Sequence, residues 1–532
     1  MPYDHIIIGA GSAGCVLADR LTADGTRRVL LLESGPRDTH PYIRIPAAFF
    51  KLFKTRVDWA FYSVPQRELY DRRLFMPRGR TLGGSGSINA MIYIRGHRED
   101  YDEWERDGCT GWGYDSLLPY FKRAENNRQH GAPHHGTDGP WHITDLQSPH
   151  PLTLAYLQAA KETGLPFLHD MNAGAGEGAG IHQVNQHNGA RHSPADAYLR
   201  PALKRPNLTV RTGVQTERIL IENRRATGVE IRCGNRAETI RCTGDVIVSA
   251  GSILSPVLLM NSGIGPADEL QKHGIRTVHA LPGVGKHLQD HPAVPIIYRS
   301  RPRTTLDTEE TAGNILRWLF RRSGPMTSNL AEGGGFFSTE PGLPAPDMQI
   351  HFAPAFFTDH GFTRPKGNGF SAAPILVKPK SRGQVTLQPG RPRLPLVDPG
   401  VFTHPDDLDT FVKGFKKVRD ILLSDGLSAY RREPFLPGSH LSTDEAIRDH
   451  VRRHVELLYH PVGTCRMGTG PGDVVSPELR VHGIENLRVA DASVMPSVVR
   501  GNTQAPTIAV AEKAADLVLG RGPASIGEEQ GL

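Results

Sequence analysis

The first 35 residues of the chain contain the feature that most constrains its fold. Three β-branched residues, Ile6–Ile8, are typical of a buried parallel strand, and the apolar spacing over residues 12–21 is that of a helix. A second apolar run, Val29–Leu32, predicts another buried strand. Strand, helix and strand in this order predict one β-α-β unit of a parallel sheet.

The turn between this first strand and the helix has the composition of a dinucleotide-binding loop. Gly9, Gly11 and Gly14 form the pattern G-x-G-x-x-G. Such glycines allow a tight turn, let the backbone approach a pyrophosphate, and let the helix pack closely on the strand. Glu33 follows at about the 20-residue spacing expected for a carboxylate that binds an adenosine ribose. The unit therefore predicts a dinucleotide site, but it does not distinguish FAD from NAD.

Length and charge limit the other possibilities. A chain of 532 residues is longer than one core usually spans, so we expect two domains or one domain with a large insertion. The formal net charge of +6 is small against 62 basic and 56 acidic residues, and the basic tracts are short. We therefore expect no nucleic-acid partner. The oligomeric state is left open.

Cysteine usage and hydropathy bear on where the protein works. The five cysteines are scattered and none forms C-x-x-C, which favours reduced thiols and an intracellular location, and we expect no metal site. No apolar run reaches the roughly 18 residues needed to span a bilayer, and the first strand leaves no room for a signal peptide. We expect a cytoplasmic protein without a transmembrane segment, and peripheral contact with the inner membrane is left open.

A second glycine-rich stretch, RGRTLGGSGSINAMIYIRG, occupies residues 78–96. Its first half is unsuited to a helix or a strand, and a flexible surface loop would satisfy that composition. However, the apolar run at residues 90–94 follows at once and needs burial. We therefore expect this loop to enter the core, where small residues let the backbone lie against a flat ligand.

The remainder of the chain changes pattern twice. Residues 246–265 resemble the first strand-turn-helix unit, which indicates a nucleotide domain that is discontinuous in sequence. From about residue 293 to residue 454, proline- and glycine-rich loops separate alternating segments such as 349–352 and 383–387, which predict an antiparallel sheet. A short strand and a helix return over residues 487–519. The tail at residues 525–532 is expected to be frayed.

Taken in order, these segments resemble the glucose–methanol–choline (GMC) oxidoreductase family, whose members oxidise alcohols with FAD. The resemblance covers nearly the whole chain. Within the family the chain is most similar to the choline-dehydrogenase-like and acceptor-linked alcohol dehydrogenase branch. The motifs that carry it are GAGSAG with Glu33, the loop at 78–96, SAGSILSPVLLMNSGIG at 249–265, GVGKHLQDHP at 283–292, and the segments around His460 and Asn502.

The resemblance implies an α/β + β fold, in which a discontinuous Rossmann-like FAD-binding domain carries a substrate domain built on an antiparallel sheet and helices. The FAD-binding domain is expected to comprise residues 1–155, 190–292 and 456–525. The substrate domain is expected to comprise residues 293–455, with residues 156–189 attached to it.

The resemblance also implies which residues bind the cofactor. Val214 corresponds to an adenine contact, and Asp491 and Ala492 correspond to the ribityl and phosphate end. The full set of cofactor-binding residues implied in this way is Gly9, Gly11, Ser12, Gly14, Glu33, Gly83, Gly84, Ser85, Asn89, Ala90, Val214, Asp491, Ala492 and Thr503. In some relatives a histidine in the second glycine loop is bonded to the flavin. That position is Ile88 here, so we expect non-covalent FAD.

The expected catalytic pair is His460 and Asn502. Oxidation of a primary alcohol requires removal of the hydroxyl proton and transfer of a hydride to flavin N5. An imidazole with a pKa near neutrality can take that proton, and a neutral amide can donate a hydrogen bond to the developing alkoxide. Other histidines, including His291 and His351, receive no role because their surroundings in the sequence predict none.

Two further residues are candidate substrate contacts. Glu332 corresponds to a glutamate that pairs with the trimethylammonium group in choline-specific relatives, although the same segment also resembles members that do not act on choline. Tyr459 could supply an aromatic face to such a cation. Packing in the core is the competing interpretation of Tyr459.

We therefore expect an FAD-dependent dehydrogenase or oxidase that converts a primary alcohol, either choline-like or a small aliphatic or aryl alcohol, to the aldehyde. Its electron acceptor would be oxygen or a quinone-like molecule. The alternative is a lyase or photodecarboxylase on the same flavin fold, because a fold does not determine a reaction.

Overall fold

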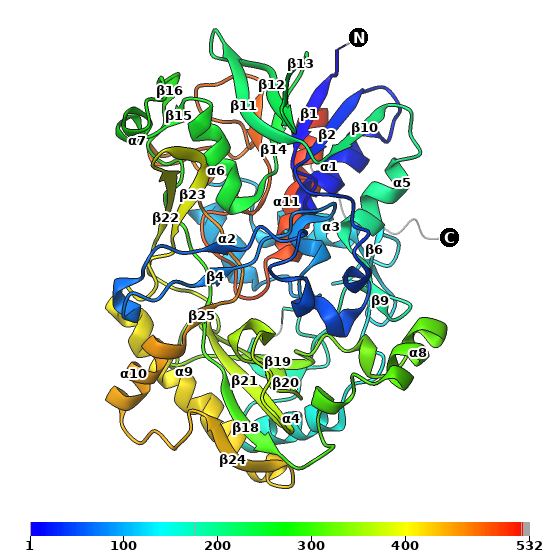
Figure 1. Ribbon diagram of the computed structural model, residues 1–532, viewed down its shortest axis with the longest axis vertical. Coiled ribbons are helices and arrows are strands. Elements are labelled where there is room, and N and C mark those ends of the chain that lie inside the picture. Colours follow the sequence, from blue (N-terminus) through cyan, green and yellow to red (C-terminus); the bar gives the residue numbers. More distant parts are fainter. Residues whose placement is uncertain (1, 175, 523, 525–532) are drawn as a thin grey trace.

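The computed structural model describes residues 2–174, 176–522 and 524 (Figure 1). Two sheets organise this part of the chain. A parallel sheet lies in the upper half of Figure 1 and an antiparallel sheet lies in the lower half. This arrangement confirms the expected fold class. The tail at residues 525–532, which we expected to be frayed, lies outside the described residues.

The parallel sheet is assembled from segments that are far apart in the sequence. Its strands lie in the order β10-β2-β1-β14-β26, and every neighbouring pair is parallel. The side chains of β2 are all buried, as expected for a strand covered on both faces. The strands are β1 (His5–Ile8), β2 (Val29–Glu33), β10 (Leu208–Thr212), β14 (Val246–Val248) and β26 (Leu487–Val489).

Two helices from opposite ends of the chain pack together beside this sheet. The first, α1 (Ser12–Thr22), follows β1 directly, and the second, α11 (Gln504–Leu519), is the last helix of the described chain. Glu512 of α11 is fully buried, and its carboxylate accepts hydrogen bonds from Arg20 of α1 at 2.8 and 2.9 Å. Further helices on this half of the molecule are α2 (Arg98–Arg106), α3 (Tyr114–Ala124), α5 (Arg200–Ala202), α6 (Gly251–Asn261) and α7 (Ala267–Lys272).

The antiparallel sheet is the main element of the lower half of the molecule in Figure 1. Its main path is β24-β18-β21-β20-β19-β7, and β17 pairs with both β21 and β25. Its strands are β7 (Gly178–Ile181), β17 (Pro292–Ala293), β18 (Ile296–Ser300), β19 (Gly333–Phe337), β20 (Met348–Ala353), β21 (Gly369–Leu376), β24 (Arg431–Leu436) and β25 (Glu456–Leu457). Around it lie α4 (Pro151–Glu162), α9 (Pro405–Leu423) and α10 (Asp444–His454).

One predicted strand lies elsewhere. The segment at 383–387 was expected to belong to the same antiparallel sheet as residues 349–352. Instead β22 (Gln384–Gln388) forms a two-stranded sheet with β23 (Arg391–Asp398) in the described structure, and this hairpin packs against α6. The alternation of the segment correctly indicated a strand, but periodicity does not identify the partner of a strand. A further antiparallel sheet contains β11 (Gln215–Glu222), β12 (Arg225–Cys233) and β13 (Arg236–Arg241).

Most strands of the two sheets come from the segments that we assigned to the two domains, but β25 belongs to the antiparallel sheet although it lies within residues 456–525. In particular β7, within residues 156–189, pairs with β19 of the antiparallel sheet. The exact domain boundaries remain a prediction.

Candidate active site

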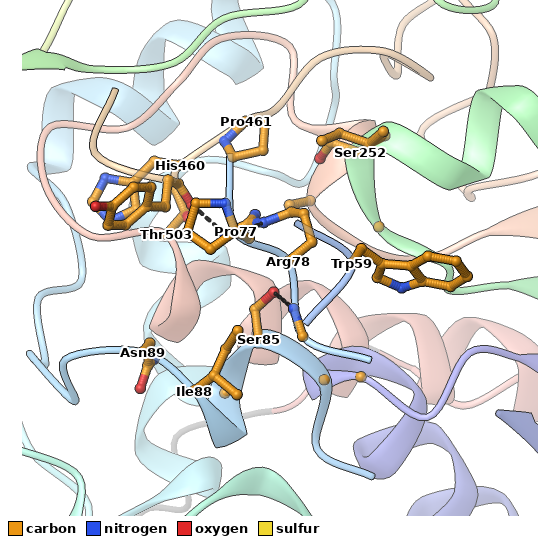
Figure 2. Close-up of a pocket in the computed structure, with 18 of the residues that line it drawn as sticks. Trp59, Pro77, Arg78, Ser85, Ile88, Asn89, Ser252, His460, Pro461 and Thr503 are labelled. Atoms are coloured by element: carbon orange, nitrogen blue, oxygen red, sulfur yellow. Dashed lines mark hydrogen bonds between the residues drawn. The ribbon is translucent and has the colours of Figure 1, made fainter. Parts of the chain in front are cut away.

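A large pocket begins at the carboxyl ends of the parallel strands and extends to the antiparallel sheet. The glycine loops line one part of it, and β20, β21 and the segment after β25 line another. Figure 2 shows Ser85, Ile88 and Asn89 in the lower part of the view and His460 and Pro461 in the upper part. Segments that the sequence separates by hundreds of residues therefore share one cavity.

Glu33 lies at the end of β2 and is buried. Its carboxylate accepts hydrogen bonds from the backbone N–H groups of Ala10 at 2.9 Å and Gly35 at 2.7 Å. Burial raises the pKa of Glu33 to about 7, and these two hydrogen bonds oppose the rise. Val214, whose backbone N–H donates to the Glu33 carbonyl at 2.9 Å, lies beside it. Both residues line the pocket at the end expected for adenosine.

The glycines of the first loop are required by close backbone packing. Gly9 has φ +103°, and a Cβ atom there would lie 2.4 Å from the Ser249 carbonyl oxygen. A Cβ atom on Gly14 would lie 1.9 Å from the Gly9 carbonyl oxygen. Gly14 therefore does not line the pocket but lets α1 pack against the loop. By contrast, Gly11 and Ser12 line the pocket at the N-terminus of α1, where unpaired N–H groups favour an anion.

The second glycine loop forms the 3-10 helix η4 (Gly84–Ser87) and packs directly on the first loop. A Cβ atom on Gly84 would lie 2.6 Å from the Cα atom of Gly11. Gly83 precedes the turn with φ +83° and supports it from outside the pocket. The Ser85 hydroxyl accepts a hydrogen bond from the Gly79 N–H at 3.1 Å (Figure 2). The loop is thus ordered and enters the core, as its sequence predicted.

Asn89 and Ala90 continue this loop along the pocket wall. The Asn89 side chain donates to Gln504 of α11, and its oxygen accepts a 2.6 Å hydrogen bond from the buried Arg191. The backbone carbonyl of Asn89 accepts a second 2.6 Å bond from the same guanidinium. Arg191 therefore holds the loop in place, a role that nothing in the sequence indicated.

Asp491, Ala492 and Thr503 lie together near two helix N-termini. The Asp491 carboxylate accepts hydrogen bonds from the Gly251 N–H at 2.8 Å and the Ser255 hydroxyl at 2.6 Å, both on α6. Thr503 immediately precedes α11. All three residues line the pocket. A residue that contacts the ribityl chain or the phosphates must do so.

Several buried polar atoms on the pocket wall have no hydrogen-bond partner among the described residues. They are the Ser252 hydroxyl, Nε2 of His351, the side-chain oxygen of Asn502 and the side-chain nitrogen of Gln504. Such groups are costly unless a ligand or water satisfies them. Together with the two glycine loops and the buried Glu33, they fit a long ligand with a phosphate-bearing middle and a polar, flat end. The residues present therefore fit FAD.

The predicted catalytic pair is brought together at the far end of the pocket. The Asn502 side-chain nitrogen lies 3.2 Å from His460 Nε2, and both residues line the cavity. Gly501 allows this approach, because it has φ +123° and a Cβ atom there would lie 2.4 Å from Ile94 Cγ2. His460 follows Tyr459, a non-glycine residue with φ +69°, whose carbonyl accepts from Arg78 at 2.6 Å.

His460 is held from its other side as well. Its backbone N–H donates to Asp290 at 2.8 Å, and its Nδ1 lies 3.1 Å from Nδ1 of His291. Burial lowers the pKa of His460 well below its usual value, and the neighbouring His291, His351 and Arg78 lower it further. The same burial lowers the pKa of His291 to about 4. Both imidazoles are therefore neutral near pH 7, so one Nδ1 donates to the other.

Two of these histidines were left without a role in the sequence analysis. His351 on β20 lines the pocket near Asn502, and His291 supports His460 from behind. The alternation of β20 carried a usable signal, because Ala353 lines the pocket from the same face two residues later. For His291 the sequence holds no such signal, since its place follows from pairing of β17 with β25.

The region beyond the catalytic pair contains several aromatic side chains, and also Asp359 and Glu456, of which Glu456 pairs with Arg72 at 3.0 Å. Tyr459 lines the pocket, packs edge-on against Phe53 at 5.7 Å between ring centroids, and its hydroxyl is hydrogen-bonded to His360. Phe49 and Phe357 contribute further rings to the wall. A substrate that reaches His460 therefore meets these aromatic rings.

The expectation that Glu332 contacts the substrate is not met. Its side chain is fully buried but is not part of the pocket wall. The carboxylate instead accepts hydrogen bonds from the Ser328 hydroxyl at 2.6 Å, the His150 N–H at 2.7 Å and the Thr153 hydroxyl at 2.7 Å. Because both carboxylate oxygens accept hydrogen bonds from the protein, Glu332 stabilises the fold and does not present a charge to a bound cation.

The chain is similar to known proteins over nearly its whole length. Two family models described as GMC oxidoreductase match residues 3–293 and 379–511. An alcohol dehydrogenase [acceptor] from Pseudomonas putida is 43% identical over 527 residues, covering 97% of this chain and 96% of that protein. The mitochondrial choline dehydrogenase of Homo sapiens is 41% identical, with coverage of 98% and 90%. Among solved structures, pyridoxine 4-oxidase from Mesorbium loti is similar with a TM-score of 0.90 at 31% identity, covering 98% of this chain and 100% of that chain.

Proposed function

This chain belongs to the GMC oxidoreductase family and is an FAD-dependent alcohol oxidoreductase, and we propose that it oxidises a primary alcohol to the aldehyde at His460 and Asn502. One observation carries this proposal. The two side chains approach within 3.2 Å of each other in the same pocket that the cofactor loops line. The three relatives named above are dehydrogenases and an oxidase, so the lyase alternative has no support.

We propose that Nε2 of His460 accepts the hydroxyl proton of the alcohol. That atom accepts a hydrogen bond from the Asn502 amide, so the imidazole proton resides on Nδ1 and is donated to His291. A neutral imidazole can take the hydroxyl proton, while the amide of Asn502 can turn to donate to the developing alkoxide. Bound FAD supplies the hydride acceptor.

The pocket wall supports an uncharged aliphatic or aryl alcohol as the substrate. The candidate anion for a choline headgroup, Glu332, is occupied by three internal hydrogen bonds. Phe49, Phe53 and Phe357 instead offer apolar surface. Choline belongs among the compounds tested, because aromatic faces alone also bind quaternary ammonium groups.

Anaerobic reduction of the bound flavin tests the reaction. Mixing the holoenzyme with primary aliphatic or aryl alcohols should bleach the visible flavin absorbance, whereas a tertiary alcohol should not, because its carbinol carbon bears no hydrogen. If no primary alcohol bleaches the flavin, the proposed reaction is wrong. If choline alone does so, the reaction stands and the assigned substrate class is wrong.

We further propose that the electrons pass to oxygen or to a quinone-like acceptor, and that the enzyme works in the cytoplasm or at the cytoplasmic face of the inner membrane. None of the described helices is both long and apolar enough to cross a membrane.

We also propose the domain boundaries stated in the sequence analysis, with the substrate domain at residues 293–455 and residues 156–189 attached to it.

Release of the cofactor tests its mode of attachment. Ile88 lines the pocket at the position where some relatives bear a flavin-bonded histidine, and its side chain offers no nucleophile. Acid or heat should therefore transfer all of the FAD to the supernatant, and the precipitated chain should be colourless. Flavin fluorescence that stays with the chain on a denaturing gel would contradict this assignment.

A further inference from the structure

The helix α8 (Ala312–Arg321) carries apolar side chains on its solvent side. Leu316 and Leu319 are 52% and 50% exposed, and Phe320 is 83% exposed. Because residues three and four apart share one face of a helix, these three side chains form one stripe. Figure 1 shows α8 at the lower right edge of the molecule.

The opposite face of α8 anchors the helix to the protein. Trp318 is buried, and its ring N–H donates to the Gly189 carbonyl at 2.8 Å. The guanidinium of Arg322 lies over the Trp318 ring at 3.9 Å from its centroid. At the other end, the Thr311 hydroxyl accepts from the Asn314 N–H at 3.2 Å and caps the helix. The exposed stripe is therefore presented by an anchored helix.

Positive charge flanks this stripe. Arg317 and Arg321 are exposed, lie four residues apart, and have no acidic partner within the described part of the chain. The acidic residues just before the helix are occupied. Glu310 pairs with Lys51 and, at 3.1 Å, with Arg364, while Glu309 accepts a 2.8 Å hydrogen bond from Asn314. The end of α8 that holds Phe320 is thus apolar and cationic.

This combination fits a lipid surface better than a protein. One stripe on a ten-residue helix offers much less than the roughly 800 Å² per partner of a stable protein interface. Interfacial helices, by contrast, place Phe and Leu among the acyl chains and Arg among anionic headgroups. We propose that α8 docks this enzyme on the surface of a membrane that contains anionic lipids.

The position of α8 relative to the pocket indicates a role for membrane docking. The helix packs against η7 (Pro325–Thr327), which packs against η2 (Pro46–Leu52). Phe49 of η2 lines the pocket. Docking through α8 therefore brings the pocket wall to the membrane side of the enzyme, where an alcohol or acceptor dissolved in the bilayer is concentrated.

Co-sedimentation of the holoenzyme with vesicles tests the proposal. Vesicles of phosphatidylcholine with about one third phosphatidylglycerol should bind the enzyme, and pure phosphatidylcholine vesicles should bind it less. Phe320→Ser and Leu316→Ser should each lower the partition coefficient by about tenfold or more, because the lost side chains no longer enter the bilayer. Arg317→Gln with Arg321→Gln should lower it by about fivefold per arginine, on anionic vesicles only.

Matched variants control for surface apolarity and for net charge. Leu154 on α4 is 53% exposed, so Leu154→Ser removes a similar side chain from another place. Arg224 and Arg236 are exposed at the turns of the β11–β13 sheet, at the top of Figure 1, so their exchange for Gln removes two charges far from α8. None of these controls should change binding, and every variant should keep its flavin and its turnover with a soluble acceptor.

The proposal is wrong if the enzyme does not bind the anionic vesicles. It is also wrong if Phe320→Ser binds as well as the parent while the exchanges of Arg224 and Arg236 weaken binding as much as the exchanges of Arg317 and Arg321. It is also wrong if the parent is an oligomer by light scattering and Phe320→Ser dissociates it, because α8 would then cover a second copy. Vesicle binding is measured without turnover, so failure here leaves the proposed reaction intact.

Discussion

Replacement of His460 by alanine is expected to slow flavin reduction by an alcohol by about 10²–10⁴-fold, the usual effect of losing a positioned acid or base. The structure provides the reason. Nε2 of His460 is the nitrogen that faces the pocket, and the imidazole is neutral because burial lowers its pKa. Flavin content should remain unchanged, since His460 lies outside the loop of Gly11 and Ser12 that is expected to bind the phosphates. Stopped-flow absorbance under anaerobic conditions measures the rate.

Two further variants give this experiment its specificity. Asn502→Ala removes one hydrogen-bond donor to a partly charged oxygen and should cost about 10–10³-fold. His450→Ala removes an equally buried histidine on α10 that does not line the pocket, and it should leave the rate unchanged. If His460→Ala were reduced as fast as the parent with full flavin content, the role of this histidine would be refuted.

Replacement of Glu33 by alanine is expected to lower FAD affinity by about 10²-fold or more. Charge-assisted hydrogen bonds that the carboxylate accepts from ribose hydroxyls contribute about 1.5–3 kcal/mol each. The variant also leaves the buried N–H groups of Ala10 and Gly35 without their acceptor, which loosens the loop that holds the pyrophosphate. The dissociation constant follows from flavin fluorescence on titration of the apoprotein.

Glu33→Gln separates the two contributions. The amide keeps an oxygen that can accept from one backbone N–H, so the loop should be less disturbed than in Glu33→Ala, and the affinity should fall by a smaller factor. The reduction rate of the remaining holoenzyme should be close to that of the parent in both variants, because Glu33 lies at the adenosine end of the pocket. If Glu33→Ala kept full flavin occupancy at low FAD concentration, Glu33 would have no role in FAD binding and would be only a structural residue at the end of β2.

The sequence alone determined the nucleotide-binding half of the protein. Ile6–Ile8, the glycine pattern and Val29–Leu32 form a β-α-β unit whose signals are local in sequence, so each can be identified without knowledge of the rest of the chain. The assignment of His460 and Asn502 depended on resemblance to a family, because no local pattern distinguishes these residues from other buried polar side chains.

The tertiary structure decided which polar side chains face the cavity. Glu332 and His351 lie on neighbouring segments of one sheet region, yet the carboxylate turns toward Ser328 while the imidazole turns toward the pocket. His291 reaches His460 only because strands distant in sequence pair beside it. Such orientations depend on long-range packing, which periodicity does not encode.

The same distinction holds for α8. Its sequence contains enough apolar residues to predict a buried face, but it does not show which of them are buried. Burial of Trp318 against the Gly189 carbonyl decides the rotation of the helix, and Leu316, Leu319 and Phe320 are therefore left in solvent. A helix of given sequence can bury either side, and only its packing partner selects one.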